Sequence, residues 1–147
     1  FRLVEEKKMI EDLFREINTN TGKGSYGLQE VIEFLKNNVV QTLLITDNTN
    51  LHRVEAKCKR CNNIQEEIVE RQLVIPKKTE YKNNPCPECK AMDMEVNEQD
   101  VIDYLQILAA KTGSQLEVIS GSAEHGNMLA SLGKVGAILR YNPGHTK

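Results

Sequence analysis

The sequence predicts an α/β fold, with helices layered on a mostly parallel sheet and one small insertion. Helical and strand patterns alternate through residues 1–51 and again through residues 91–147. Residues 52–90 break that alternation and contain all four cysteines and three of the four prolines. Strands separated by helices favour α/β layers. A length of 147 residues suits one domain with an insertion better than two full-sized domains.

Residues 1–18 are predicted to form an amphipathic helix, because four apolar residues follow the i, i+3, i+4, i+7 spacing of one helical face. Turn-forming residues 18–25 end this helix, and a second amphipathic helix follows. Residues 42–46 are a short apolar and β-branched run, which predicts a strand buried on both faces, and residues 47–50 form a turn or loop. The inward-facing residues of the two helices are Ile10, Leu13, Phe14, Ile17, Leu28, Val31, Ile32 and Leu35.

The same alternation resumes after residue 96. Asn97 is predicted to cap a helix that ends at Gly113. Residues 116–119 and 135–139 are predicted strands, and Ser122 is predicted to cap the short helix between them, which runs to Leu132. The apolar side of the helix after Asn97 carries Val101, Ile102, Leu105, Leu108 and Ala109.

The charge of the chain is nearly balanced, with 19 Lys and Arg against 21 Asp and Glu, for a formal net charge of −2. This balance excludes a generally basic nucleic-acid-binding protein but not a local basic patch. No apolar run approaches the roughly 20 residues of a membrane span, and no signal peptide opens the sequence. We therefore expect a cytoplasmic protein without a membrane partner. Because Phe1 lies within a predicted helix, we also expect a fragment of a longer protein.

The four cysteines form two Cys-x-x-Cys pairs, Cys58 with Cys61 and Cys86 with Cys89. Two residues between paired cysteines let both sulfur atoms converge on one ion, and two such knuckles complete a tetrahedron around Zn²⁺. Between the pairs, residues 67–75 alternate in polarity and are predicted to form a strand or hairpin. Four cysteine ligands leave no open position, so we expect one structural Zn²⁺ that supplies most of the folding energy of the insertion.

Free thiols, disulfides and a redox-active pair are the alternatives for these cysteines. Four scattered thiols would seldom fall into two such pairs, and a reducing compartment disfavours disulfides. A redox Cys-x-x-Cys site would explain one pair and leave the other without a role.

The sequence gives no support for catalysis. His125 lies near Ser122 and Glu124, but no nucleophile elbow accompanies them, and we interpret His125 as a surface residue near a helix start. Residues 22–25 lack the upstream glycine of a phosphate loop and follow a helix instead of a strand. We therefore predict that the chain is not an enzyme and has no small-molecule substrate.

Several segments resemble the C-terminal domain of class I peptide-chain release factors of the archaeal and eukaryotic type. The ending Gly136-Ala137-Ile138-Leu139-Arg140-Tyr141 matches that family's Gly-Gly-Ile-Leu-Arg-Tyr with one Gly replaced by Ala. The resemblance covers essentially the whole chain, and the paired cysteines point to the archaeal branch. The other matching segments are residues 1–20 with Glu6-Lys7-Lys8, then Thr21-Gly22-Lys23, Tyr26-Gly27 and the strand of residues 42–47.

The resemblance implies an α/β/α sandwich like that of kink-turn RNA-binding ribosomal proteins, formed by residues 1–51 and 91–147. Residues 52–90 would then be an inserted zinc-binding β minidomain. The implied function is that of a domain that docks a translational GTPase of the elongation-factor type and helps to position the factor on the ribosome in translation termination. The family triggers hydrolysis with a Gly-Gly-Gln loop in another domain, and this sequence contains no Gly-Gly dipeptide.

By the same resemblance, the GTPase-docking surface involves the first helix and the last strand. Burial competes with this interpretation, because Phe14 shares a helical face with Ile10 and alternation turns at least one apolar strand residue toward the core. Arg140 and Tyr141 are the stronger candidates, since Arg and Tyr often dominate interface energies. The complete predicted set is Phe14, Gly136, Ile138, Leu139, Arg140 and Tyr141.

Two alternatives remain open at this point. A Pelota-type ribosome-rescue factor shares this domain but lacks the Thr-Gly-Lys segment and the cysteine-bearing insertion. A stand-alone RNA-binding module needs clustered Lys and Arg, whereas the α/β body is net acidic. The insertion is the basic region, with nine Lys and Arg against six Asp and Glu, and it either forms a solvated surface or approaches ribosomal RNA. Its candidate RNA-facing residues are Lys57, Lys59, Arg60, Lys77, Lys78 and Lys82.

Overall fold

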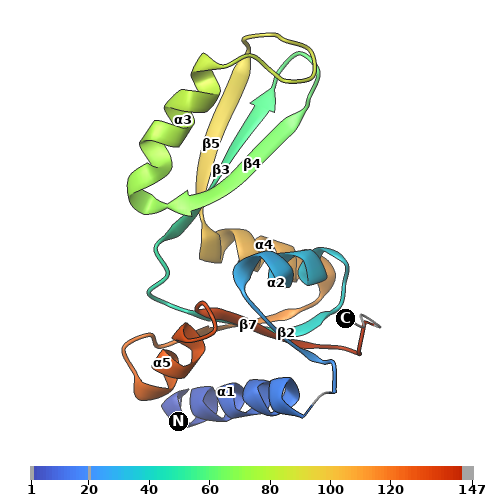
Figure 1. Cartoon of the computed structure of the whole chain (residues 1–147), viewed down its shortest axis with the longest axis vertical. Coiled ribbons are helices and arrows are strands. Elements are labelled where there is room, and N and C mark those ends of the chain that lie inside the picture. Colours follow the sequence, from blue (N-terminus) through green and yellow to red (C-terminus); the bar gives the residue numbers. More distant parts are fainter. Residues whose placement is uncertain (1, 20, 144–147) are drawn as a thin grey trace. The chain divides into compact units, whose positions relative to one another are not determined.

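The computed structural model describes residues 2–19 and 21–143, which form two compact units (Figure 1). The first unit combines the chain up to Thr49 with the chain from Leu105 onward. The second unit runs from Asn50 to Tyr104. It is therefore longer than residues 52–90, the segment that composition alone marks out.

The first unit contains a four-stranded sheet in the order β1-β7-β2-β6. Its strands are β1 (Gly24–Tyr26), β2 (Val40–Thr46), β6 (Gln115–Ile119) and β7 (Val135–Leu139). Only β2 and β6 are parallel, since β7 runs antiparallel to both β1 and β2. The prediction of a mostly parallel sheet was wrong, because alternating helices and strands do not determine the direction in which the last strand enters the sheet.

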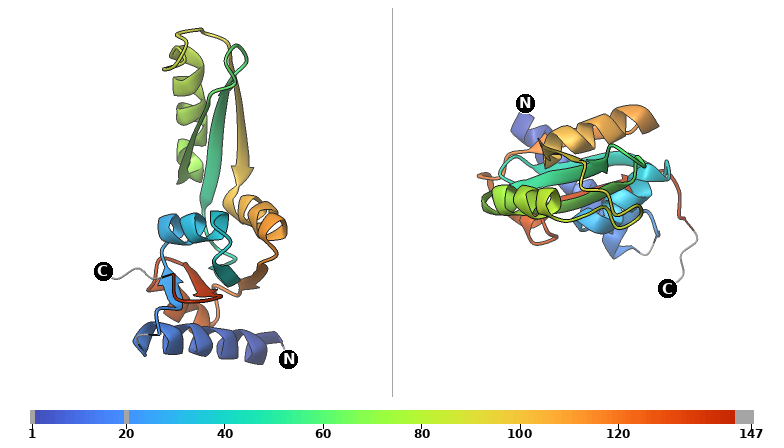
Figure 2. Two further views of the ribbon diagram at one scale, coloured as in Figure 1. Left: turned by 90° about the vertical axis from the view of Figure 1, so that its right-hand side faces the viewer. Right: turned by 90° about the horizontal axis from the view of Figure 1, so that it is seen from above.

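Helices cover both faces of this sheet. Helices α1 (Arg2–Asn18) and α5 (Glu124–Ala130) lie on one face, and α2 (Leu28–Lys36) lies on the other with the later turns of α4 (Val101–Thr112) (Figures 1 and 2). The first unit therefore has three layers. Between α1, α5 and the sheet lies a cluster of fully buried side chains, made of Ile10, Leu13, Leu44, Ile119 and Leu129.

The helix and strand predictions for the first unit are largely confirmed, and the helix caps are not. Asn97 lies in a strand opposite Glu55, and α4 begins only at Val101. There the carboxylate of Asp100 accepts a 2.8 Å hydrogen bond from the backbone N–H of Ile102. Ser122 does not cap α5, whose N-cap is Ala123 without a side-chain hydrogen bond. The apolar periodicity identified these helices but gave their first turns incorrectly.

The second unit is an antiparallel three-stranded sheet with one helix packed against it. Its strands, in the order β4-β3-β5, are β3 (Leu51–Cys58), β4 (Ile64–Glu70) and β5 (Met94–Asp100). A short 3₁₀ turn (Arg71–Leu73) leads into α3 (Val74–Asn83), which contacts β3 and β5. The small core of this unit consists of Val54, Val69 and Val74, with Tyr81 and Val96 packed against them.

Two features of the second unit differ from the sequence-based expectation. The predicted strand or hairpin of residues 67–75 continues into a helix, because β4 ends at Glu70. The apolar pattern does not predict this helix, since Val74 is its only buried residue and Ile75 beside it is 74% exposed. The unit also includes β5, which pairs with β3 along seven residues. No helix in the described part of the chain is long and apolar enough to span a bilayer.

Candidate metal centre

The structure brings all four cysteines of the second unit together. Cys58 is the last residue of β3, Cys61 follows in the next turn, and Cys86 and Cys89 lie in the loop between α3 and β5. The Sγ atoms of Cys58 and Cys89 lie 3.5 Å apart, as do those of Cys61 and Cys86. All four sulfur atoms lie within 4.8 Å of one another. Each close contact joins one knuckle to the other.

The two knuckles share one backbone geometry. In the first, the N–H of Cys58 donates to the carbonyl of Asn63 and the N–H of Asn62 donates to the carbonyl of Cys58. In the second, Cys86 makes the equivalent bonds with Ala91 and Lys90. The fourth residue after each leading cysteine has a left-handed backbone, with φ of 65° at Asn62 and 67° at Lys90. The chain therefore forms the same tight turn twice around a common point.

Strand register holds the knuckles against each other. Cys58 pairs with Met94 in the β3–β5 ladder, so the second knuckle emerges directly beside the first. The N–H of Lys59 donates to the carbonyl of Asp93 at 2.9 Å. The side chains of Arg60 and Asp93 approach to 3.5 Å. Strand pairing and backbone hydrogen bonds therefore bring the two knuckles together.

Backbone hydrogen bonds favour ionisation of the two buried cysteines. The N–H of Cys89, helped by that of Glu88 and opposed by burial, lowers the pKa of the Cys86 thiol to about 6. The N–H of Cys61 lowers the pKa of Cys58.

The thiol pKa values of the two exposed cysteines are raised instead of lowered. At Cys61 the N–H of Asn63 is outweighed by partial desolvation of the sulfur and by the Cys86 sulfur, which raise the pKa of Cys61 to about 12. At Cys89 the N–H of Ala91 is outweighed by the Cys58 sulfur, and the pKa is raised. All four sulfur atoms could therefore be thiolates together only with a cation between them.

The donor set fits a tetrahedral divalent ion. Zn–S bonds of about 2.3 Å in a tetrahedron separate the sulfur atoms by about 3.8 Å. The two distances of 3.5 Å and the upper limit of 4.8 Å bracket that value. Zinc would be held by Cys58, Cys61, Cys86 and Cys89, with no vacant position for a substrate. Its chemistry would be structural.

Known proteins of one family match this chain over nearly its whole length. Residues 3–143 match the family model described as eRF1 domain 3. The chain belongs to the eRF1 domain 3 family. It is 32% identical over 141 residues to peptide chain release factor subunit 1 of Methanocaldococcus jannaschii, covering 95% of this chain and 34% of that protein. The corresponding protein of Thermococcus onnurineus is 35% identical over 140 residues, covering 94% of this chain and 33% of that protein.

The chain thus spans about a third of the length of these curated relatives. Among solved structures, the C-terminal domain of a peptide chain release factor from Methanosarcina mazei is 28% identical, with a TM-score of 0.80 over 97% of this chain and 86% of that one. Archaeoglobus fulgidus Pelota shares the fold at 22% identity, with a TM-score of 0.57 over 98% of this chain and 32% of that one.

The residues expected to form the docking surface of this eRF1 domain 3 chain lie in different environments. Phe14 and Ile138 are half-buried and pack on the same core cluster between α1 and the sheet. Gly136 is buried, and a Cβ there would lie 2.4 Å from Cδ2 of Leu13. Leu139 is 2% exposed. Gly136 and Leu139 are thus explained by packing alone.

Arg140 and Tyr141 follow directly after β7 and are both exposed. Tyr141 exposes 52% of its surface. The Arg140 guanidinium donates a 2.7 Å hydrogen bond to the carbonyl of Thr112, which ties the end of β7 to the end of α4. Of the six residues in the predicted set, these two present their side chains most fully to solvent.

Several basic residues of the second unit lie beside carboxylates. Lys77 lies 3.1 Å from Glu67 and 3.2 Å from Glu80, and these contacts raise its pKa. Lys78 lies 3.9 Å from Glu98. A surface interspersed with ion pairs favours the solvated interpretation over a continuous basic patch.

The first unit contains a buried polar cluster that was not predicted from the sequence. His125 was expected on the surface, but it is only 8% exposed, and its Nε2 lies 2.9 Å from Oε1 of Glu6. The same carboxylate accepts a 3.0 Å hydrogen bond from the backbone N–H of Ser120. The available signal was the position of Glu6 four residues before Ile10, on the apolar face of the first helix.

Proposed function

We propose that this chain acts in translation termination as the C-terminal domain of a release factor. In this role it docks a translational GTPase of the elongation-factor type and helps to position the factor on the ribosome in the cytoplasm. The observation that carries the proposal is the agreement with the Methanosarcina mazei release-factor domain, which extends over nearly all of both chains. The domain itself performs no catalysis, and one Zn²⁺ stabilises its second unit.

The end of β7 is the proposed contact for the GTPase. Arg140 and Tyr141 are exposed beside each other there. An arginine and a tyrosine at one site are the residue types that most often dominate binding energy. Phe14 and Ile138 are half-buried on the α1 side of the sheet and would contribute less exposed contacts.

The test is a calorimetric titration of the archaeal elongation-factor-type GTPase with the parent chain and with Arg140→Ala and Tyr141→Ala. We expect each truncation to cost about 2 kcal/mol, or roughly thirtyfold in affinity. Because Arg140 also bonds Thr112, each variant needs an unchanged circular dichroism spectrum and melting curve. Met92→Ala in the second unit is the control, since Met92 is 61% exposed. Folded variants that bind like the parent would place the docking site elsewhere.

A Pelota-type rescue factor is the second candidate, favoured by the match to Archaeoglobus fulgidus Pelota over 98% of this chain. A further archaeal Pelota of the same fold is described as ribosome-bound together with ABCE1. This supports association with the ribosome for the second candidate as well. Sequencing the complete gene separates the two candidates. An upstream Gly-Gly-Gln segment indicates a release factor, and its absence favours Pelota.

A further inference from the structure

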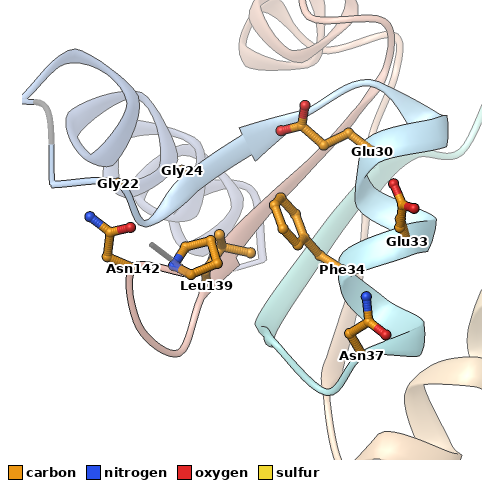
Figure 3. A pocket seen from close by; sticks show the side chains of 9 residues that line it. Gly22, Gly24, Glu30, Glu33, Phe34, Asn37, Leu139 and Asn142 are labelled. Carbon is orange, nitrogen blue, oxygen red and sulfur yellow. The ribbon is translucent and has the colours of Figure 1, made fainter. Parts of the chain in front are cut away.

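A cavity of about 490 Å³ opens in the first unit between α2 and the end of β7 (Figure 3). Phe34 projects into it from α2, and Leu139 lies at its base. Gly22, Gly24 and Asn142 form the facing wall (Figure 3). The volume falls in the range of roughly 300–1,000 Å³ typical of ligand sites. The proposed function assigns this cavity no role.

One stripe of α2 builds the wall that carries Phe34. Glu30, Glu33, Phe34 and Asn37 follow the i, i+3, i+4, i+7 spacing and all line the cavity. The buried residues of α2 lie on a separate stripe, formed by Val31, Ile32 and Leu35. Phe34 therefore stands outside the core face of its helix, as an aromatic ring flanked by carboxylates.

The Glu30 carboxylate is held in place by a buried neighbour. Ser25, only 1% exposed, donates a hydrogen bond from its hydroxyl to Oε2 of Glu30 at 2.7 Å. A carboxylate fixed in this way loses little further side-chain entropy when it binds a ligand. The cavity thus has a preorganised anionic group beside an aromatic one.

The facing wall is narrow and uncharged. Asn142 donates from Nδ2 to the carbonyl of Thr21 at 3.4 Å. In this position it lies against Gly22, where a Cβ would lie 2.2 Å from that nitrogen. Among the described residues that line the cavity, two are carboxylates and none is Lys or Arg. The negative charge of the lining favours a cationic ligand.

We infer that this cavity receives an arginine side chain of the docked GTPase. The inference rests on the proposed function and adds a second contact to it, on the α2 side of the sheet. A guanidinium group is planar and weakly hydrated, stacks on aromatic rings and forms paired hydrogen bonds with carboxylates. Phe34 supplies the ring, Glu30 and Glu33 supply the carboxylates, and the amides of Asn37 and Asn142 supply further polar contacts.

The first experiment tests the cavity without any GTPase. The ¹⁵N-labelled chain is titrated with the peptide acetyl-Gly-Arg-Gly-amide and with the same peptide carrying citrulline, which is nearly isosteric and uncharged. We expect the arginine peptide to shift the amide signals of Glu33, Phe34 and Asn37, and the citrulline peptide to bind at least fivefold more weakly. Equal binding of the two peptides, or shifts confined to other residues, would overturn the inference.

The second experiment tests the occupant. Phe34→Leu removes the ring but keeps an apolar side chain, and Glu30→Gln removes the charge but keeps an acceptor for Ser25. Each is expected to weaken GTPase binding about tenfold, while Glu95→Gln, a matched change at an exposed site of the second unit, has no effect. If the parent binds and both cavity variants bind equally well, the inference fails and the proposed function stands. If the parent does not bind the GTPase, both fail, and the peptide titration still reports on arginine binding.

Discussion

Oε1 of Glu6 lies 2.9 Å from Nε2 of His125, and this contact joins α1 to α5 across 119 positions of the sequence. Glu6 is 2% exposed and His125 is 8% exposed. A carboxylate removed from water needs hydrogen-bond donors in compensation. His125 and the backbone N–H of Ser120 provide them. The pair therefore fixes the position of α5 against α1.

We expect Glu6→Ala to lower the free energy of unfolding by about 3 kcal/mol, because it leaves buried donors without their acceptor. Urea unfolding followed by circular dichroism measures the change. Glu11→Ala, on the exposed side of the same helix, is the control and should change stability by less than about 0.5 kcal/mol. A loss no greater than that of the control would show that the cluster is not stabilising.

Gly136→Ala should destabilise the first unit by about 1–3 kcal/mol, as overpacking of a filled core does. The reason is steric, since the new Cβ would lie 2.4 Å from Cδ2 of Leu13. In a Leu13→Ala background the same substitution should cost much less, because the clashing atom is gone. Equal costs in both backgrounds would exclude this contact as the cause. The double-mutant cycle can be measured by thermal unfolding.

Elemental analysis should find one Zn²⁺ per chain. Loading at pH 7 should release at least the protons of Cys61 and Cys89, whose thiol pKa values are raised in the metal-free site. The Cys86 thiol has a pKa of about 6, so below pH 6 it also binds a proton that zinc must displace. Affinity should therefore fall as the pH is lowered, with a steeper fall below pH 6. Calorimetry in buffers of different ionisation enthalpy counts the protons.

Cys58→Ser should unfold the second unit and leave the first largely intact, because each unit has a hydrophobic cluster of its own. Amide signals of β3, β4 and β5 should collapse toward random-coil positions, while those of β2 and β7 keep their native dispersion. A single cooperative loss of all signals would show that the two units do not fold independently.

Lys90→Gly should stabilise the second unit by about 0.5–1 kcal/mol. Lys90 has φ of 67°, a left-handed backbone that costs a residue with a Cβ about 1–2 kcal/mol. The greater chain entropy of glycine in the unfolded state offsets part of that gain. Lys59→Gly is the matched control, because Lys59 is an exposed knuckle lysine without a positive φ, and it should destabilise.

Sequence patterns predicted most of the first unit because its strands and helices are apolar on the faces they bury. Leu43, Leu44 and Ile45 are all fully buried, as a continuously apolar strand requires. The direction of β7 could not be predicted, because side-chain alternation is the same in parallel and antiparallel strands. The contact between Glu6 and His125 could not be predicted either, since the two residues are far apart in sequence.

The convergence of the four cysteines was predictable from spacing alone, since two Cys-x-x-Cys pairs can supply four donors to one point. The structure around them was not. Helix α3 buries too few side chains to produce a periodic pattern, and β5 is mostly polar, with Val96 its one aliphatic residue facing the small core. The exposed cavity beside Phe34 could not be predicted from the sequence, because it forms only where the end of β7 lies next to α2.

Strand β3 carries the apolar contact of Val54 near its middle and a candidate metal ligand at its last residue, Cys58. The middle of this strand is therefore stabilised by exclusion of water, whereas a bound ion would stabilise its last residue. Removing the ion should release the Cys58 end first and the rest of the second unit after it, so hydrogen exchange should accelerate at Cys58 before it does at Val54. The supply of zinc would then determine how far this strand frays and how long the knuckles survive proteolysis.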